Sequence, residues 1–389
     1  MSITAVSPQK IVNETFKLSN FWHKLEHMLI VYYHYDSDVP VKSWEYQNFY
    51  IKGYDFRDIP KEDQEVLQSD WNKVHQYVSE QTKKYEDTKS PEFKDAISKM
   101  SSALRPELMY IDLAPRKTPR FRLKRSYVTG MVQDFFNNKY ESITKQLTNI
   151  DNIKEILHQN TEKYKYKTFR ELTHIFGLEE KYSKSLAEQI VVRMFGSETK
   201  KITNIPIFKK ADISLKTITV TENRKRTEDT KLGRLYFSEL MENENFENSP
   251  FYTMFADKIF IFVLFEEAVG ETDPLNNKFL GFKWITFDDD FIYGSVKKAW
   301  EHTYQLIESG NLKEDYVYTR NGEKRKNKNN TYQKQLNFIK SKENDVFLRG
   351  TGQDSNDKTE ILNGISMYKQ YIWIKGKAIV DMLNKKPFI

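Results

Sequence analysis

Cysteine does not occur among the 389 residues, which excludes disulfide bonds, thiolate zinc sites and a cysteine nucleophile. Long apolar runs do not occur either. The longest, such as Met28–Tyr33 and Ile259–Phe265, are far shorter than the roughly 20 residues that cross a bilayer. The first residues also lack the basic segment and apolar run of a signal peptide. We therefore expect a soluble, cytoplasmic protein with no membrane partner.

Motifs for nucleotide binding and for histidine-based metal sites are missing as well. Neither G-x-x-x-x-G-K-[ST] nor G-x-G-x-x-G is present, which disfavours nucleotide hydrolysis and Rossmann cofactors. The 7 histidines show neither H-x3-H nor H-E-x-x-H spacing, and His23 and His27 are most simply a solvated helix face. Asp288–Asp290 is the densest acidic run, and adjacent side chains rarely hold one ion. A turn or helix N-terminus is therefore the simpler interpretation of that run.

Apolar and aromatic residues are abundant enough, at 39% and 14%, to build packed cores, and the length favours two domains. The net charge is only +6, from 61 basic and 55 acidic residues, but the basic residues cluster in two runs. Each run alone fits solvated surface, whereas two matching runs favour a polyanionic partner. The basic residues of the runs are Arg105, Arg116, Lys117, Arg120, Arg122, Lys124 and Arg125, and then Arg320, Lys324, Arg325, Lys326, Lys328, Lys334, Lys340 and Lys342.

The two halves of the chain repeat a common order of motifs. Asn13–Phe21 and Asn243–Phe251 both read N-E-x-F-x-x-S-x-F. Each then continues through a lysine, an apolar run, an amphipathic stretch with a tryptophan, and a lysine–aromatic segment that enters a helix. These are Lys24, Met28–Tyr35, Trp71 and Arg120–Lys124 in the first half, and Lys258, Ile259–Phe265, Trp300 and Tyr368–Trp373 in the second. A duplicated domain is the expectation.

The region between the copies has helical periodicity. Apolar residues recur three and four positions apart, and Gly196 is a plausible helix stop. We place the domain boundary near residue 150, with 1–150 as the first domain and 151–389 as the second. Asn137–Asp151 is the connector, and the second domain opens with helices before an alternating strand at Ile213–Val220. The expected helices cover Ile150–Leu157, Phe169–Phe176 and Lys184–Phe195.

The strand at Ile213–Val220 resembles part of a nuclease site. An acid, one intervening residue and a lysine on a strand lie on one face, where carboxylates bind a divalent metal and the lysine helps to activate water. Here Ser214 stands two residues before Lys216 in place of an acid. Alternation gives Asp212 the same face, one pleat earlier, so it is a weak candidate metal ligand. An ordinary amphipathic strand remains the alternative.

The order of these blocks resembles the MutH-like endonucleases, and most closely the GATC-specific type II restriction enzymes built from two MutH-like domains. In that family the strand reads E-L-K-T or E-V-K-T, which Ser214–Thr217 matches except at the acid. The resemblance implies that Lys24 and Lys258 are two copies of a further site lysine. It also implies an α/β fold of two restriction-endonuclease-like domains, each a mixed sheet flanked by helices. The intact family performs Mg²⁺-dependent hydrolysis of double-stranded DNA.

Departures from the family pattern limit what the resemblance implies. The other two acidic positions fall at Val192 and Ile207, so neutral residues occupy all three. Mg²⁺ takes oxygen ligands, and we expect the second domain to be a pseudonuclease that acts as a DNA-binding effector without Mg²⁺. Ser214, Lys216, Lys258 and Lys24 are then remnants of a catalytic site or phosphate contacts.

The first copy lacks its strand for another reason. Lys216 lies 27 residues before Asn243, whereas only 12 residues precede Asn13. We therefore expect the first domain to be truncated at its N-terminus, with its catalytic strand before Met1. A missing N-terminal nuclease piece is a possible partner.

Double-stranded DNA is the principal partner that the resemblance implies. The Phe-x-Leu-Lys-like motif that opens a helix beside DNA resembles Phe121–Lys124. A stand-alone, catalytically dead DNA-binding regulator, or a subunit of a separately encoded nuclease, remains the alternative function. The expected DNA contacts are Arg120, Lys124 and Tyr127 in the first domain, and Arg349, Lys369 and Lys375 in the second.

Overall fold

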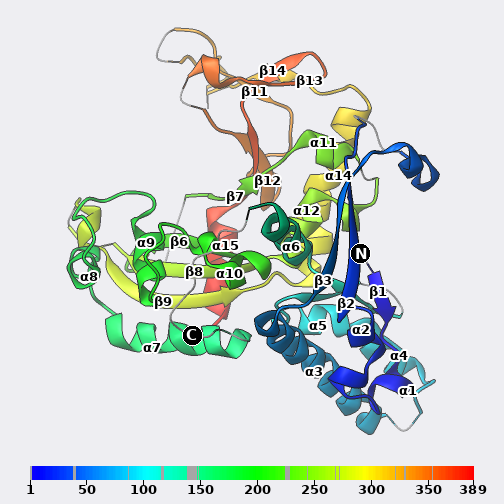
Figure 1. The fold of residues 1–389 in the computed structure, drawn as a ribbon. Helices are drawn as coiled ribbons and strands as arrows, with labels where there is room; N and C mark the ends of the chain where they lie inside the picture. The colour runs from blue at the N-terminus through cyan, green and yellow to red at the C-terminus, as the bar shows by residue number, and fades with distance from the viewer. Residues whose placement is uncertain are drawn as a thin grey trace. The chain divides into compact units, whose positions relative to one another are not determined.

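The computed structural model describes residues 2–37, 41–85, 87–114, 118–137, 147, 149–223, 228–242, 244–267, 269–270, 272–319, 321–327, 330–352 and 354–389. The chain forms two compact units that mix helices with small sheets (Figure 1). Unit 1 contains Met1–Arg224, Asp257–Thr286 and Lys386–Ile389, and unit 2 contains Lys225–Ala256 and Phe287–Lys385. In the described part of the chain, no helix is long and apolar enough to span a membrane. Six single residues named above lie outside that part, Met1, Arg116, Lys117, Asn243, Arg320 and Lys328, as does most of the expected connector Asn137–Asp151.

The first 137 residues contribute a three-stranded antiparallel sheet, a two-stranded ribbon and several helices to unit 1. The sheet has the order β1-β5-β4, and β2 pairs with β3 in the ribbon. The elements are β1 (Ser2–Ala5), α1 (Pro8–Ile11), η1 (Phe16–Leu18), α2 (Asn20–His23), β2 (His27–Tyr33), η2 (Ser43–Asn48), β3 (Ile51–Asp58), α3 (Lys61–Lys84), α4 (Pro91–Ser98), α5 (Met100–Leu104), β4 (Ile111–Ala114), β5 (Arg120–Leu123) and α6 (Arg125–Asn137).

A second sheet of unit 1 has the order β6-β8-β9, in which β6 and β8 are parallel and β8 and β9 antiparallel. All but the last residue of β8 is buried, as expected of a central strand covered on both faces. The elements are α7 (Ile150–Tyr164), α8 (Phe169–Phe176), α9 (Leu186–Met194), η3 (Ile202–Asn204), α10 (Pro206–Lys210), β6 (Ile213–Val220), β8 (Ile259–Glu266), η6 (Pro274–Asn276) and β9 (Lys278–Ile285).

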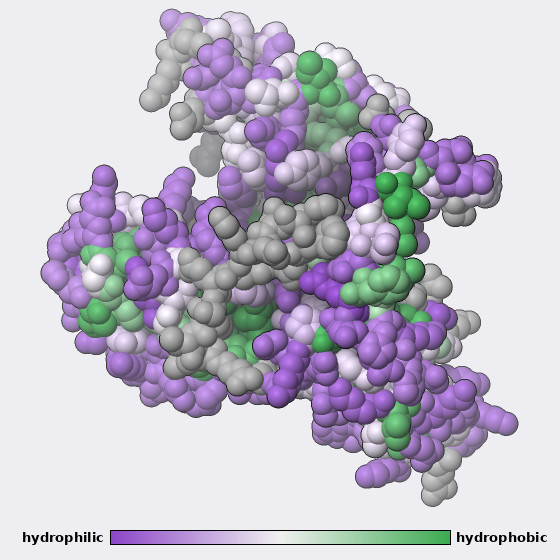
Figure 2. All heavy atoms as spheres, in the orientation of Figure 1, coloured by the Kyte–Doolittle hydropathy of each residue, from purple (hydrophilic) through white to green (hydrophobic). Residues whose placement is uncertain are grey.

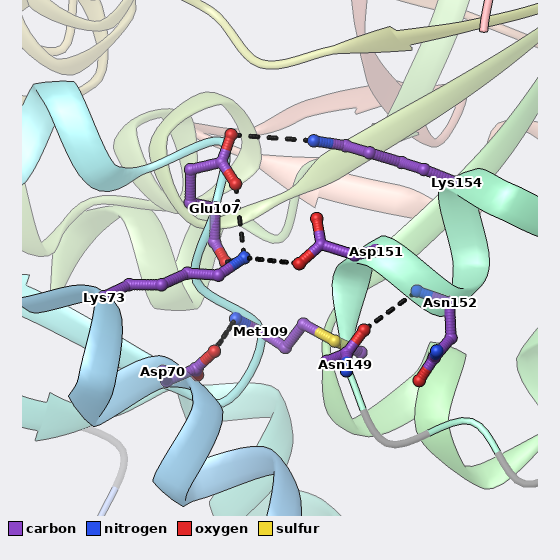
Figure 3. A network of polar contacts seen from close by, with 8 residues as sticks. All are labelled: Asp70, Lys73, Glu107, Met109, Asn149, Asp151, Asn152 and Lys154. Carbon is purple, nitrogen blue, oxygen red and sulfur yellow. Dashed lines mark hydrogen bonds and ion pairs between the residues drawn. The ribbon is translucent and has the colours of Figure 1, made fainter.

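One hydrophobic core runs through unit 1 and joins residues on both sides of position 150. It includes Trp71 of α3, Ile153 of α7 and Val263 of β8. Polar contacts cross the same position: the Lys73 ammonium lies 3.4 Å from Asp151 Oδ2, and the Lys154 ammonium lies 3.6 Å from Glu107 Oε1 (Figure 3). The compact units therefore do not follow the boundary drawn from the repeat, which stays a prediction about the two copies.

Unit 2 contains a three-stranded antiparallel sheet with the order β12-β15-β7 and two small hairpins, β10–β11 and β13–β14. Asp288 accepts a hydrogen bond from the Phe291 amide, so the acidic run Asp288–Asp290 opens a helix as expected. The elements are β7 (Thr230–Arg234), α11 (Phe237–Met241), η4 (Phe246–Asn248), α12 (Pro250–Tyr252), η5 (Thr253–Asp257, whose last residue lies in unit 1), α13 (Asp289–Phe291), η7 (Ile292–Val296), α14 (Lys297–Glu308), β10 (Glu314–Tyr316), β11 (Lys334–Leu336), β12 (Val346–Gly350), η8 (Ser355–Asp357), β13 (Glu360–Leu362), β14 (Ile365–Met367), β15 (Gln370–Ile374) and α15 (Gly376–Lys385).

The two N-E-x-F-x-x-S-x-F motifs adopt similar local structures. In the first, Ser19 is fully buried and caps α2 by accepting a hydrogen bond from the Trp22 amide at 3.1 Å. In the second, Ser249 is equally buried and accepts from the Tyr252 amide at 3.1 Å. The serine of the motif therefore serves as a helix N-cap in both places.

The tryptophans of the repeat pack on equivalent aromatic rings. Phe16 lies 6.1 Å from Trp71, and Phe246 lies 5.4 Å from Trp300, measured between ring centroids. Both tryptophans belong to long helices, α3 and α14, and each phenylalanine belongs to the short helix that starts its motif. The repeated sequence order thus accompanies repeated packing.

The elements expected from sequence periodicity are present. The three expected helices correspond to α7, α8 and α9, and Gly196 has the positive φ of a helix stop, +75°. The strand expected at Ile213–Val220 is β6. The apolar runs form β2 and β8, and both lysine–aromatic segments lead from a strand into a helix, β5 into α6 and β15 into α15.

Candidate functional site

The start of the parallel strands β6 and β8 brings together two residues expected at a site. The Lys258 ammonium pairs with Asp212 Oδ1, and Ile213 lies opposite Ile259 in the register. Asp212 precedes β6 in a turn with φ +54°, so strand alternation does not extend to it. The expectation that Asp212 continues the face of Ser214 is therefore wrong, because its backbone is left-handed rather than extended.

Asp257, the residue before Lys258, lies close enough to this pair and to Asp112, Arg122 and Lys124 to interact with their charges. Burial, followed by the negative charge of Asp112, raises the pKa of Asp257 to about 7. Its Oδ1 is buried, and the described residues offer that atom no hydrogen-bond donor. Asp112 of β4 is itself paired with Arg122 of β5. Each of Asp112 and Asp212 thus already has a cationic partner, while Asp257 favours its neutral form.

Sequence reasoning missed Asp257 and Asp112. Asp257 directly precedes Lys258 and could have been noticed from that position. Asp112 belongs to the first half of the chain, and only the tertiary fold brings its charge near residues 212 and 257. Among the described residues, no group of three histidines or carboxylates has the geometry of a metal site.

The lysine expected at the equivalent place of the first half has a different partner. The Lys24 ammonium donates to the backbone carbonyl of Ile3 in β1, at 3.0 Å. It follows α2 and precedes β2, as Lys258 precedes β8. This arrangement ties β1 to the segment before β2.

The structure corrects the expectation for Lys124 and Tyr127. Lys124 is 5% exposed, and burial lowers the pKa of its ammonium. Tyr127 is fully buried and donates a hydrogen bond to Asp63 Oδ2 at 3.1 Å. A phosphate contact requires an accessible polar group, so we assign both residues to the interior of unit 1. Arg120 on β5 is half-buried.

Unit 2 contains a basic groove of about 650 Å³. Five lysines and arginines and a single acid, Glu314, contribute to its lining, which gives the charged side chains a net +4. Glu314 is shared by two lysines, at 3.1 Å from Lys358 and 3.8 Å from Lys334. The basic residues of the groove are Lys334, Lys340, Lys342, Arg349 and Lys358, of which the first three belong to the second basic run of the sequence.

Arg349 is held in place at the rim of this groove. Its guanidinium lies 4.9 Å from the ring centroid of Phe347 and 5.0 Å from that of Trp373. Asp229 Oδ2 accepts a hydrogen bond from Arg349 Nη2 at 2.7 Å, and Asp229 Oδ1 accepts one from the Gly376 amide. The side chain is still 46% exposed, so aromatic packing and one carboxylate orient a guanidinium that solvent reaches.

The other two residues expected to bind DNA in the second half lie on either side of β15. Lys369 is exposed immediately before this strand, and its neighbour Tyr368 lines the groove. Lys375 is half-buried between β15 and α15, and its backbone amide donates to the carbonyl of Asp345 at 2.8 Å. Asp229, which anchors Arg349, was not expected from the sequence because it lies 120 residues away.

Comparison with known proteins supports the predicted resemblance. The family model of the DNA mismatch repair enzyme MutH matches residues 1–70. The type II restriction enzyme Sau3AI of Staphylococcus aureus is 24% identical over 330 residues, which cover 79% of this chain. This chain is a relative of the MutH-like restriction endonucleases. The matched region covers 64% of the Staphylococcus enzyme, less than two thirds of its length.

The MutH-like positions that the resemblance assigns to acids can now be located in the second half. Val192 of α9 is fully buried, and Ile207 of α10 is 7% exposed; both belong to the core of unit 1. Ser214 and Lys216 are half-buried on β6, beside Phe260 and Phe262 of β8. Apolar side chains in a packed core provide no oxygen ligands, so these positions do not fit Mg²⁺.

Proposed function

We propose that this relative of the GATC-specific restriction enzymes binds double-stranded DNA through the basic groove of unit 2 and cleaves it little or not at all. The basic groove carries the proposal: five cationic side chains surround one carboxylate in a cavity of about 650 Å³. Lysines and arginines that neutralise phosphates release condensed counterions, which gives affinity without reading sequence.

In this proposal Arg349 recognises the base sequence of the DNA. A guanidinium can donate two hydrogen bonds to the O6 and N7 atoms of guanine in the major groove. Asp229 Oδ2 accepts a hydrogen bond from one terminal nitrogen of Arg349, at 2.7 Å, and the guanidinium lies within 5.0 Å of two aromatic ring centroids, which restricts its motion. A preorganised fork loses less side-chain entropy on binding than a free one. We assign backbone contacts to Lys369 and Lys375.

Low cleavage activity follows from the residues at the family's catalytic positions. Val192 and Ile207 are core residues, and Ser214 replaces the strand acid. Asp212, a carboxylate close to these positions in sequence, is paired with Lys258. We therefore regard Lys216 and Lys258 as remnants of a hydrolytic site.

The domain organisation in this proposal is that of two MutH-like domains, 1–150 and 151–389. The similar packing around Phe16 and Phe246 supports a duplication. A separately encoded nuclease subunit would be a partner, and magnesium would act in that subunit rather than in the second domain. The alternative is a stand-alone regulator that binds the same DNA.

Two lysines of the groove provide the test. Lys340→Ala combined with Lys342→Ala should weaken binding of a GATC duplex and reduce the slope of log affinity against log salt by about 2, one unit per phosphate contact. Lys298→Ala is the matched control, since Lys298 is an exposed lysine of unit 2 that does not line the groove. Equal affinities and slopes for the double variant, the control and the parent would refute the groove as the DNA site.

A further inference from the structure

The β2–β3 ribbon has an apolar face that the described chain leaves exposed. On this face Leu29 lies opposite Phe56, and Val31 lies opposite Tyr54. The four side chains are between 46% and 77% exposed. Figure 2 shows hydrophobic residues gathered over this ribbon. We call Leu29, Val31, Tyr54 and Phe56 the ribbon face.

The opposite face of the ribbon packs on unit 1, whereas one edge of β2 has no described strand beside it. Met28 and Ile30 point to the other side and pack against the core of unit 1, so the ribbon is anchored on one face only. Within the described residues, β3 is the only strand that pairs with β2. An edge strand beside an exposed apolar face is a template for pairing with another chain, and natural proteins usually protect such edges.

The β8–β9 hairpin shows what covers a surface of this kind. Both hairpins have a bulge next to a glycine. Tyr32 pairs with Gly53 and Tyr33 with Ile51, which leaves one extra residue in β3; Leu264 pairs with Gly281 and Phe265 with Phe279, which leaves one extra residue in β9. Superposing the bulges equates Val31 with Val263 and Tyr54 with Phe282. Leu29 and Phe56 then correspond to Ile261 and Trp284. Ile261, Val263 and Phe282 are at most 1% exposed.

Residues 150–220 provide that cover in the second hairpin. β6 runs parallel to β8 along the edge that corresponds to the edge of β2 with which no strand of the described residues pairs. Phe169 of α8 stacks on Phe265 with ring centroids 3.7 Å apart. Thr161 of α7 lies so close to Gly281 that a Cβ there would come within 2.8 Å of its Cγ2. A layer of helices and one parallel strand therefore bury the hairpin.

We infer that the ribbon face and the free edge of β2 bind a partner polypeptide that repeats the arrangement of residues 150–220. Its amphipathic helices cover Leu29, Val31, Tyr54 and Phe56, and its strand runs parallel to β2. The partner comes from outside the described chain, because residues 150–220 are already engaged on β8–β9. The inference rests on the match between the two hairpins and is independent of DNA binding in the basic groove.

A chimera tests this inference directly. Residues 150–229 are placed immediately before Ser2. The strand β1 lies at the sheet edge beside β5, just as β7 lies at the sheet edge beside β15. Residues 221–229 connect β6 to β7 in the chain, so the same segment can connect the added strand to β1. Amide exchange in β2, followed by mass spectrometry, should slow by about tenfold or more relative to the parent chain. Unchanged exchange in a chimera that contains the folded extension would overturn the inference.

Two substitutions supply the specificity control. Val31→Lys with Tyr54→Lys should leave the stability of the parent nearly unchanged, because both side chains are exposed, but should remove the protection of β2 in the chimera. Ile361→Lys, at a 77% exposed apolar residue of unit 2, should leave that protection intact. If the chimera aggregates, residues 150–229 are co-expressed as a separate chain, which should co-purify with the parent and not with the double variant.

A second copy of this chain is the competing occupant of the ribbon face. Light scattering on the parent chain should report a monomer that the double lysine variant leaves unchanged. A dimer that the variant converts to monomer would overturn the inference and identify a second copy as the partner.

Discussion

Loss of the Lys210 ammonium should destabilise unit 1 by several kcal/mol. Lys210 Nζ lies 2.8 Å from Asp63 Oδ2 and 3.2 Å from Oδ1, and the Tyr127 hydroxyl donates to the same carboxylate. The two side chains are only 11% and 6% exposed. Lys210→Met keeps the length of the side chain but leaves Asp63 buried without its cation. Breaking a buried pair in this way costs about 3–5 kcal/mol.

A second substitution in the buried pair and a control at an exposed pair test this estimate. Adding Asp63→Leu to Lys210→Met should recover much of the loss, because an apolar pair removes the unpaired charge. Lys99→Met is the control: Lys99 and Asp95 form an ion pair with side chains 68% and 59% exposed, so solvent screens the two charges and the loss of stability should be small. The free energy of unfolding is measured by urea denaturation for the parent and the three variants. A loss no larger than the control, or one that Asp63→Leu does not reduce, would refute the reasoning.

Three more substitutions follow from the polar contacts. Asp70→Ala removes the acceptor of the Met109, Tyr110 and Ile111 amides and should lower the free energy of unfolding by several kcal/mol, at about 1–3 for each unsatisfied donor; an unchanged urea midpoint would contradict this. Because the pKa of Asp257 is raised to about 7, stability should fall as pH rises from about 4 to 7. Asp257→Asn should reduce this dependence of the free energy of unfolding on pH, as measured by urea titrations. An unaltered pH profile would exclude Asp257 as its source. Asp229→Ala should reduce the preference of Arg349 for GATC over scrambled duplex, with little change in salt slope; a preserved preference would exclude the positioning role.

Local sequence patterns predicted the elements well because helices and strands depend on neighbours in the chain. The apolar spacing in α7–α9 and the alternation in β6 lie within each element. The amphipathic stretches around Trp71 and Trp300 lie in helices α3 and α14. These features need no knowledge of distant residues.

The site was harder to predict because its partners are distant in sequence. Lys124 and Tyr127 belong to a basic run, yet the fold buries them, and Tyr127 bonds to a carboxylate 64 residues away. Asp257 owes its raised pKa to burial and to Asp112, which no local pattern connects to it. The anchoring of Arg349 by Asp229 likewise depends on tertiary contacts of unit 2.

The most direct test of the account is a binding and cleavage assay on the purified chain. A duplex with one central GATC and a scrambled duplex are incubated with and without Mg²⁺ at two salt concentrations. The account predicts that the GATC duplex is retarded in a gel without being cut, and that higher salt weakens the complex. Mg²⁺-dependent cutting by the chain alone would contradict it, and would mean that Asp212 or another carboxylate holds the metal.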